Sequence, residues 1–234
     1  MKTRSKIQIV ACGPGLDSIN AKHGRSCDWL ESIIESDSLD ISIIEAYKGE
    51  KPLLSDDTVW FIMGSRYSAY SDLDWIKSLE KQLQIGIQNK IPMLGICFGH
   101  QVLCQALGAK VVKNRNGWEI GSAKMGLTEK GLESSLFDGF EDSFCAYESH
   151  QDVVVDLPSN IDILAYNNYG IQSFSFSDHI YGVQFHPEFN FEVMKAYYDI
   201  RVNSLENKDD YYVEDKNDGI DVINNFIKFN LKGK

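Results

Sequence analysis

The sequence has few cysteines, no excess of basic residues and no long apolar run. No two of its five cysteines are separated by two residues, and an odd number cannot all pair. A disulfide framework and a zinc site are therefore not expected, and reduced thiols in the cytoplasm fit better. The 23 Lys and Arg residues against 34 Asp and Glu give a formal net charge of −11. This charge argues against nucleic-acid binding, which needs a basic face.

No apolar run approaches the roughly 20 residues that cross a bilayer, so no membrane partner is expected. The opening MKTRSK leads straight into a strand-like run and does not resemble a signal peptide. Gly13-Pro14-Gly15 is too short a glycine pattern for nucleotide binding, and the sequence shows no metal-ligand cluster. The predictions are a cytoplasmic protein with no cofactor and no metal.

The chain length suits one domain covering residues 1–234. Its first half alternates apolar strands with helices: strands at 6–12, 39–46, 59–63 and 92–96, and helices at 28–36, at 72–88 with an N-cap at Ser71 or Asp72, and after 98. Short alternating segments at 123–127, 144–146, 152–155, 163–166, 171–176 and 180–184 predict β-hairpins. A helix over 192–205, a charged loop over 206–218 and a helix over 220–231 complete the chain, with a C-terminal extension from about 206 to 234. The fold class is α/β: an open, mostly parallel central sheet flanked by helices, with added β-hairpins.

The most informative stretch is 91–107, IPMLGICFGHQVLCQAL, which predicts a strand, a sharp turn and an apolar-periodic helix. Glycines on both sides of Cys97 suit a strained turn that holds a nucleophile exposed. The helix start offers free N–H groups and a positive dipole end, which favour a thiolate. The alternative is a buried structural cysteine in a strand–helix crossover, which would leave the flanking glycines unexplained.

A cysteine nucleophile needs a base and a group that orients the base. His186 is the best of the five histidines because it follows the apolar run YGVQF and is followed by Pro187 and Glu188. If His186 ends a strand, alternation places Glu188 on the same face. The strand end would bring both to the edge of the sheet where the Cys97 turn also lies. Taken alone, His-Pro-Glu could equally be a turn with a solvated glutamate.

An oxyanion hole needs two N–H donors. The backbone N–H of Phe98 follows the nucleophile and is one candidate. Gly64, at the end of the strand over 59–63, is the other, because a residue without Cβ allows close approach. Gly64 could also be an ordinary glycine at a strand end.

Four motifs carry a family resemblance. GICFGHQ at 95–101 and GVQFHPE at 182–188 look like the two signatures of class I (triad) glutamine amidotransferases. ESHQDVV at 148–154 resembles the amidotransferase domain of GMP synthase, and NRNGWEIG at 114–121 is similar to stand-alone GMP-synthase-like amidotransferases and the plant γ-glutamyl peptidases. The resemblance covers roughly residues 6 to 200 and implies a flavodoxin-like sheet.

By this resemblance, Cys97 attacks a γ-carbonyl, His186 acts as acid and base, and Glu188 orients it. A γ-glutamyl thioester forms, and water then releases glutamate. Gln101, Ser149 and His150 match the family's substrate-binding positions. Gln101 could instead be a surface residue of its helix. The run Met63-Gly64-Ser65-Arg66 lacks the proline usual in the family's loop, which leaves the loop shape and the bound substrate open.

Two enzymatic functions remain open: a glutaminase that supplies ammonia to a separate synthetase partner, and a self-contained γ-glutamyl peptidase or hydrolase. The likeness to GMP synthase favours the first, and the GWEIG segment favours the second. A non-catalytic binding protein on the same scaffold is a third possibility, disfavoured because all three triad positions are filled. A cysteine-dependent stress protein or protease would not explain the pairing of His186 with Glu188.

Overall fold

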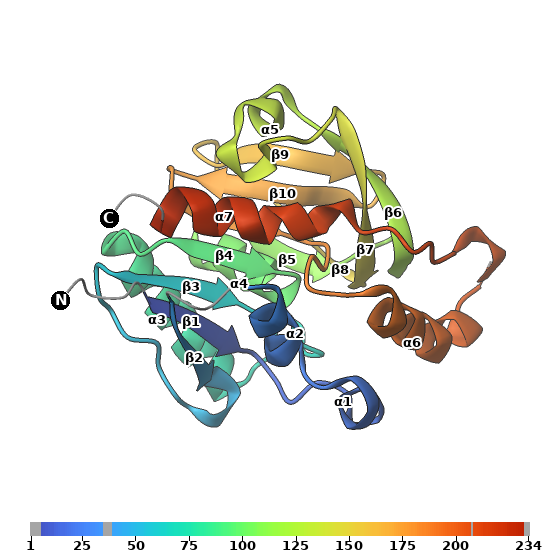
Figure 1. Cartoon of the computed structure of the whole chain (residues 1–234), viewed down its shortest axis with the longest axis horizontal. Helices are drawn as coiled ribbons and strands as arrows, with labels where there is room; N and C mark the ends of the chain where they lie inside the picture. Colours follow the sequence, from blue (N-terminus) through green and yellow to red (C-terminus); the bar gives the residue numbers. More distant parts are fainter. Residues whose placement is uncertain (1–5, 35–38, 207, 232–234) are drawn as a thin grey trace.

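The computed structural model describes residues 6–34, 39–206 and 208–231 and is built on a nine-stranded sheet (Figure 1). In spatial order the strands are β2 (Asp40–Glu45), β1 (Lys6–Ala11), β3 (Thr58–Ile62), β4 (Met93–Ile96), β11 (Ile180–Val183), β10 (Gly170–Phe176), β9 (Asp162–Asn167), β6 (Glu119–Leu127) and β7 (Ser143–His150). The five strands from β2 to β11 are parallel, and the pairs from β11 to β7 are antiparallel. Strands β5 (Lys110–Lys113) and β8 (Asp152–Val155) form a separate antiparallel pair.

The α-helices are α1 (Asp17–His23), α2 (Ser26–Ile33), α3 (Asp74–Gln88), α4 (Phe98–Ala106), α5 (Glu129–Glu133), α6 (Phe191–Arg201) and α7 (Asp221–Leu231). Short 3-10 turns lie at Ala46–Lys48, Ser135–Phe137, Val202–Ser204, Lys208–Asp210 and Asp218–Ile220. Within the described ranges, no helix is both long enough and apolar enough to cross a membrane.

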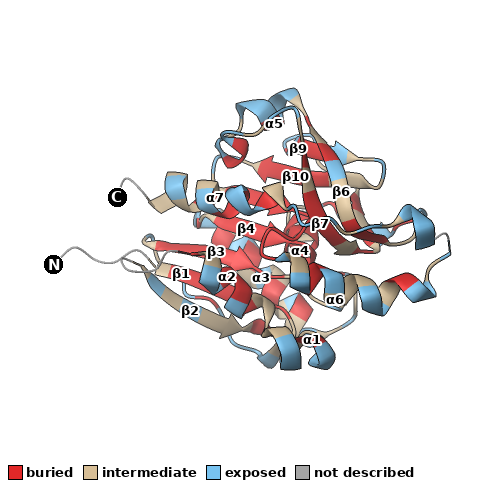
Figure 2. Ribbon diagram, turned by 45° about the vertical axis from the view of Figure 1, so that its right-hand side comes forward, coloured by how far each residue is buried: buried red, intermediate tan, exposed pale blue. Residues whose placement is uncertain are grey.

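Side-chain alternation along β3 explains the layered core. Val59 and Phe61 pack on one face, with residues of α2 and α7, whereas Trp60 and Ile62 pack on the other face, with residues of α3 and α4. A parallel strand buried on both faces needs an uninterrupted apolar run, and β3 is fully buried. Figure 1 shows α7 lying across the near face of the sheet, and Figure 2 shows the buried residues gathered in the central strands.

The α/β fold class is confirmed: helices flank the parallel part of the sheet, and the hairpins extend it. Every expected strand is present, but β6 and β7 are longer than expected. Helices α1 and α5 and strand β5 were not predicted. Positions 35 and 36 of the expected helix at 28–36 lie outside the described residues, as do 207 and 232–234 of the expected C-terminal extension.

Some expected boundaries were wrong. The helix expected over 192–205 ends at Arg201, and a 3-10 turn over Val202–Ser204 follows it. The N-cap of α3 is Leu73, with no side-chain cap, because the Asp72 carboxylate pairs with Lys77 instead of capping the helix. Strand β11 ends at Val183, so His186 and Glu188 lie in the turn that follows and not on one face of a strand. The backbone N–H of His186 instead donates to the Tyr147 carbonyl on β7 at 2.8 Å.

The turn between β4 and α4 is packed against β3 with no room for a side chain on either flanking glycine. A Cβ on Gly99 would lie 2.0 Å from the Ile62 carbonyl oxygen, and a Cβ on Gly95 would lie 2.5 Å from the backbone of Gly99. The atoms nearest to such a Cβ belong to the backbone of the turn itself or of a central strand. The two glycines are therefore required by close approach of the chain.

We expect Gly99→Ala to lower the free energy of unfolding by about 2–4 kcal/mol, because overpacking against a fixed strand forces the backbone to shift. Urea unfolding followed by circular dichroism measures the loss. Gly126→Ala is the matched control, since the nearest atom to its Cβ would be Tyr166 Cζ at an ordinary 3.5 Å. Equal stability of the two variants would contradict the close packing of this turn.

Candidate active site

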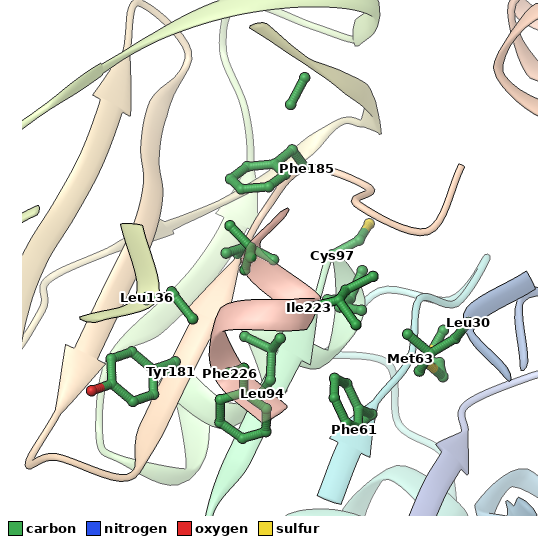
Figure 3. Packing of buried hydrophobic residues seen from close by; sticks show 14 of the residues in the cluster. Leu30, Phe61, Met63, Leu94, Cys97, Leu136, Tyr181, Phe185, Ile223 and Phe226 are labelled. Carbon is green, nitrogen blue, oxygen red and sulfur yellow. The ribbon is translucent and has the colours of Figure 1, made fainter. Parts of the chain in front are cut away.

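Cys97 stands between β4 and α4 in a backbone conformation that few non-glycine residues adopt. Its φ is 52° and its ψ is −102°. Such strain persists only where the surrounding structure holds it, and here the Cys97 N–H donates to the Val183 carbonyl at 2.9 Å. Figure 3 shows Cys97 at the end of the packed cluster, with its sulfur pointing away from Ile223 and Phe61. The cysteine is 6% exposed, and it lines a pocket.

His186 and Glu188 form a buried pair in the turn after β11. The Nδ1 atom of His186 lies 2.9 Å from Glu188 Oε1, and the residues are 6% and 2% exposed. The His186 ring stacks on Phe189 with centroids 4.0 Å apart, and Phe189 stacks in turn on Tyr197. The carboxylate and the stacked ring together fix the orientation of the imidazole and leave its Nε2 free of Glu188.

The electrostatic environment of His186 favours its charged form. Burial disfavours the imidazolium, but the negative charges of Glu188 and Cys97 outweigh burial and raise the pKa of His186 to about 10. An imidazolium at neutral pH is the partner that stabilises a neighbouring thiolate. The ring is therefore suited to hold a proton near Cys97 and to release it to a leaving group.

The pocket that contains Cys97, His186 and Glu188 also contains a second thiol, Cys27. Burial raises the pKa of Cys27 to about 11, so this thiol stays protonated at neutral pH. The charge of Cys97 helps to raise the pKa of His186, the imidazole base of the pocket. Chemistry in this pocket is therefore expected at Cys97.

Gly64 and Phe98 flank the nucleophile as expected. Strand β3 pairs directly with β4, and a Cβ on Gly64 would lie 3.2 Å from His186 Cε1 and 3.8 Å from the Cys97 Cβ. Phe98 is the first residue of α4, where backbone N–H groups have no acceptor within the helix. Both residues stay the predicted oxyanion donors.

Only one of the three residues predicted to bind substrate lies in the pocket wall. Ser149 lines the pocket, whereas Gln101 and His150 are not among the described residues that line it. Gln101 Nε2 donates to the Asp152 carbonyl at 3.2 Å and to Gln184 Oε1 at 3.0 Å, and the residue is 3% exposed. The side chain of Gln101 thus joins α4 to neighbouring segments and is not a surface residue of its helix.

His150 belongs to a buried cluster that joins β6 and β7. Its Nε2 lies 2.9 Å from Glu119 Oε2 and 3.3 Å from Glu148 Oε2, and its Nδ1 lies 2.9 Å from the Asp152 carbonyl. Burial opposes a charged ring, but the two carboxylates outweigh it and raise the pKa of His150. Ligand atoms of Glu119, Glu148 and His150 lie within 4.8 Å of one another, close enough to hold a metal ion. The imidazolium supplies one positive charge to the two carboxylates. Asn167 and Gln172 also donate to Glu119, whereas burial and the charge of Glu119 raise the pKa of Glu148 to about 7.

The segment over 211–217, here called the strap, is a feature that the sequence did not indicate. The Tyr147 hydroxyl donates to the Glu214 carbonyl at 2.7 Å. Asn217 Nδ2 donates to the carbonyls of His186 and Phe189, both at 3.0 Å. The strap therefore holds the turn that presents His186, although the charged composition of the segment favours an ordinary solvated loop.

We expect Asn217→Ala to lower kcat about 10-fold with little change in KM, because both carbonyls of the His186 turn lose their donor and the imidazole is less well placed. Steady-state kinetics separates the two parameters. Asn225→Ala is a matched control, since Asn225 Nδ2 donates to the carbonyls of Leu136 and Asp138 away from the pocket. If both variants lose stability and neither loses kcat, the strap does not position His186.

Comparison with known proteins shows the family of the chain. The model of the family "Glutamine amidotransferase class-I" matches residues 64–199, which contain Gly64, Cys97, Ser149, His186 and Glu188. The chain belongs to the class I glutamine amidotransferase family.

The curated relatives include γ-glutamyl peptidases, subunits of GMP synthase and a glutamine amidotransferase-like protein of Schizosaccharomyces pombe. γ-Glutamyl peptidase 5 of Arabidopsis thaliana is 34% identical over 61% of this chain and 58% of its own length. The glutamine-hydrolyzing GMP synthase subunit of Methanococcus aeolicus is 37% identical over 48% of this chain and 59% of its own length. The matched region thus spans less than two thirds of either relative. A glutamine amidotransferase from Thermotoga maritima shares the fold, with a TM-score of 0.71 at 24% identity over 88% of this chain and 86% of that one.

Proposed function

We propose that this chain hydrolyses a γ-glutamyl amide through a thioester on Cys97, acting as one amidotransferase-like domain over residues 1–234 that includes the C-terminal extension from about 206. The observation that supports this proposal best is the buried His186–Glu188 pair, which shares one pocket with Cys97. With all five cysteines free, the proposed location is the reducing cytoplasm.

In the proposed reaction the Cys97 sulfur attacks the γ-carbonyl carbon, and the carbonyl oxygen becomes an oxyanion. The backbone N–H groups of Gly64 and Phe98 donate to that oxyanion. His186 gives its proton to the departing nitrogen, the C–N bond breaks, and a γ-glutamyl thioester remains. Water then loses a proton to His186 and attacks the thioester, the C–S bond breaks, and glutamate leaves.

Glu188 has an orienting role in this proposal, because its carboxylate fixes His186 Nδ1 and stabilises the imidazolium. Ser149 contributes to binding the amino-acid end of the substrate from the pocket wall. Gln101 and His150 would act through the backbone of the segment that they hold, since their side chains bond within the protein.

The γ-glutamyl peptidases and the GMP synthase subunits among the relatives suggest two substrates. A γ-glutamyl peptidase would release glutamate from a γ-glutamyl peptide without help. A glutaminase would release ammonia from glutamine for a synthetase partner.

The test is glutamate release by the purified chain from L-glutamine and from glutathione, with Cys97→Ala as the blank. Fast release from glutathione supports the peptidase, and slow release from glutamine alone supports the glutaminase with a partner. Absence of Cys97-dependent release from both would favour a non-catalytic binding protein.

A further inference from the structure

One wall of the pocket, here called the arginine wall, is positively charged although the protein as a whole is acidic. Three of the five arginines in the chain, Arg25, Arg66 and Arg201, line the pocket of a chain whose formal net charge is −11. Glu188 is the one carboxylate among the described residues that line it, and Glu188 is engaged by His186. The pocket is therefore a local site of positive charge.

The three arginines differ in how far their charges are already satisfied. Arg25 lies 3.3 Å from Asp28 and 3.5 Å from Glu45, so two carboxylates neutralise it. Arg66 is exposed and lies against the ring and hydroxyl of Tyr67. Arg201 has no carboxylate within ion-pair distance anywhere in the described ranges, and its buried Nε has no hydrogen-bond partner there.

Arg201 is held in place by an aromatic ring. Its guanidinium carbon lies 3.9 Å from the centroid of Trp118, within the GWEIG segment. Stacking fixes the plane of a guanidinium and leaves its N–H groups free to donate in that plane. Burial opposes the charge of the guanidinium, although the charge of Cys97 favours it. A half-buried, oriented cation that pairs with no carboxylate is costly unless a ligand supplies one.

Arg201 lies just outside the part of the chain that matches the family model. The family model matches residues 64–199, whereas Arg201 and the pocket residues between Gly13 and Trp29 lie outside that match. The part of the pocket inside the match holds the nucleophile, the base, Ser149 and Arg66. Arg201, outside the match, is suited to a part of the substrate that varies from one member to another, which is the group beyond the scissile amide.

We propose that Arg201, assisted by Arg66, is a specificity-determining residue that binds a carboxylate on the leaving group, so that the chain prefers γ-glutamyl amino acids and peptides to glutamine. The proposal rests on the proposed hydrolysis. Ammonia, the leaving group of glutamine, carries no carboxylate and gains nothing from the arginine wall. A planar guanidinium can instead hold a carboxylate through two parallel N–H bonds.

The test compares two substrates that differ in one group, γ-glutamylglycine and γ-glutamylglycinamide. The wild-type chain is expected to prefer the free carboxylate by about 10–100-fold in kcat/KM, the range for a charge-assisted hydrogen bond that one substrate lacks. Arg201→Gln is expected to bring this ratio close to 1, chiefly by raising KM for γ-glutamylglycine. Arg201→Lys is expected to keep a smaller preference, because lysine retains the charge without the stacked fork.

Arg115→Gln is the matched control, since Arg115 borders a different groove, and its ratio is expected to equal that of the wild type. Because the readout is a ratio, a general loss of activity on mutation cancels. An unchanged ratio in Arg201→Gln, with or without an equal loss on both substrates, would overturn the proposal. Hydrolysis of glutamine by a wild type that hydrolyses neither test substrate would overturn the preference alone, whereas failure on glutamine as well would count against the proposed function itself.

Discussion

Replacing Cys97 by alanine is expected to reduce glutamate release by at least about 10⁵-fold, because the nucleophile has no substitute in the mechanism. The side chain forms the thioester, and the remaining pocket can only bind and orient substrate. Removal of the sulfur leaves the strained turn in place, since β4 and α4 are fixed by Gly95 and Gly99. The variant should therefore fold with native circular dichroism and unfold near the wild-type urea midpoint.

The control for this experiment is Cys145→Ala, which removes a partly buried thiol outside the pocket. It should retain wild-type activity. Iodoacetamide labelling followed by mass spectrometry gives an independent readout, because the reactive thiolate is expected at Cys97 and not at Cys104, whose pKa is raised by burial. Cys97→Ala with full activity, combined with loss of activity in Cys27→Ala, would transfer the nucleophile to the second thiol of the pocket.

Glu188→Gln is expected to lower kcat/KM by about 10³–10⁴-fold, less than loss of the nucleophile. Glutamine is nearly isosteric with glutamate, so the packing around His186 is kept. The neutral amide, however, no longer stabilises the imidazolium, and it can present either an oxygen or an NH₂ group to Nδ1. The loss therefore measures the orienting and electrostatic contribution of the carboxylate.

The same variant should change the pH dependence of the remaining activity. In the wild type, burial acts to lower the pKa of His186, but Glu188 and Cys97 raise it to about 10, so activity should fall only as pH rises toward 10. Without Glu188, burial is less opposed, and the alkaline limb of the kcat/KM profile should move to lower pH by about 1–3 units. An alkaline limb at the same pH in both proteins would mean that Glu188 does not set the protonation of His186.

The free energy of unfolding should also depend on pH through His186. The pKa of His186 is raised above its ordinary value of 6.5 in the folded chain. The charged ring therefore stabilises the fold fully below pH 6.5, and that contribution is lost as pH rises from 6.5 through about 10. Urea unfolding at intervals across this window should show a decline that is smaller in Glu188→Gln.

The sequence by itself determined the parts of the site that depend on local backbone requirements. Glycines on both sides of Cys97 indicated a tight turn, and the structure shows that each one faces backbone atoms too close for a Cβ. Apolar runs such as 59–63 indicated buried parallel strands, because a strand covered on both faces has no polar positions. His186 and Glu188 were found from their spacing, although the turn that pairs them is not the strand expected.

The tertiary structure alone decided the features built from distant segments. Gln101 looked like a candidate for contact with substrate, but its amide bonds to residues more than 50 positions away. The strap over 211–217 has the composition of a solvated loop, and only the folded chain places Asn217 beneath the His186 turn. Arg201 and Trp118 are far apart in the sequence and meet in space. Local patterns report backbone strain and burial, whereas pairing of single side chains across the fold depends on how the sheet and helices pack and leaves no periodic signal.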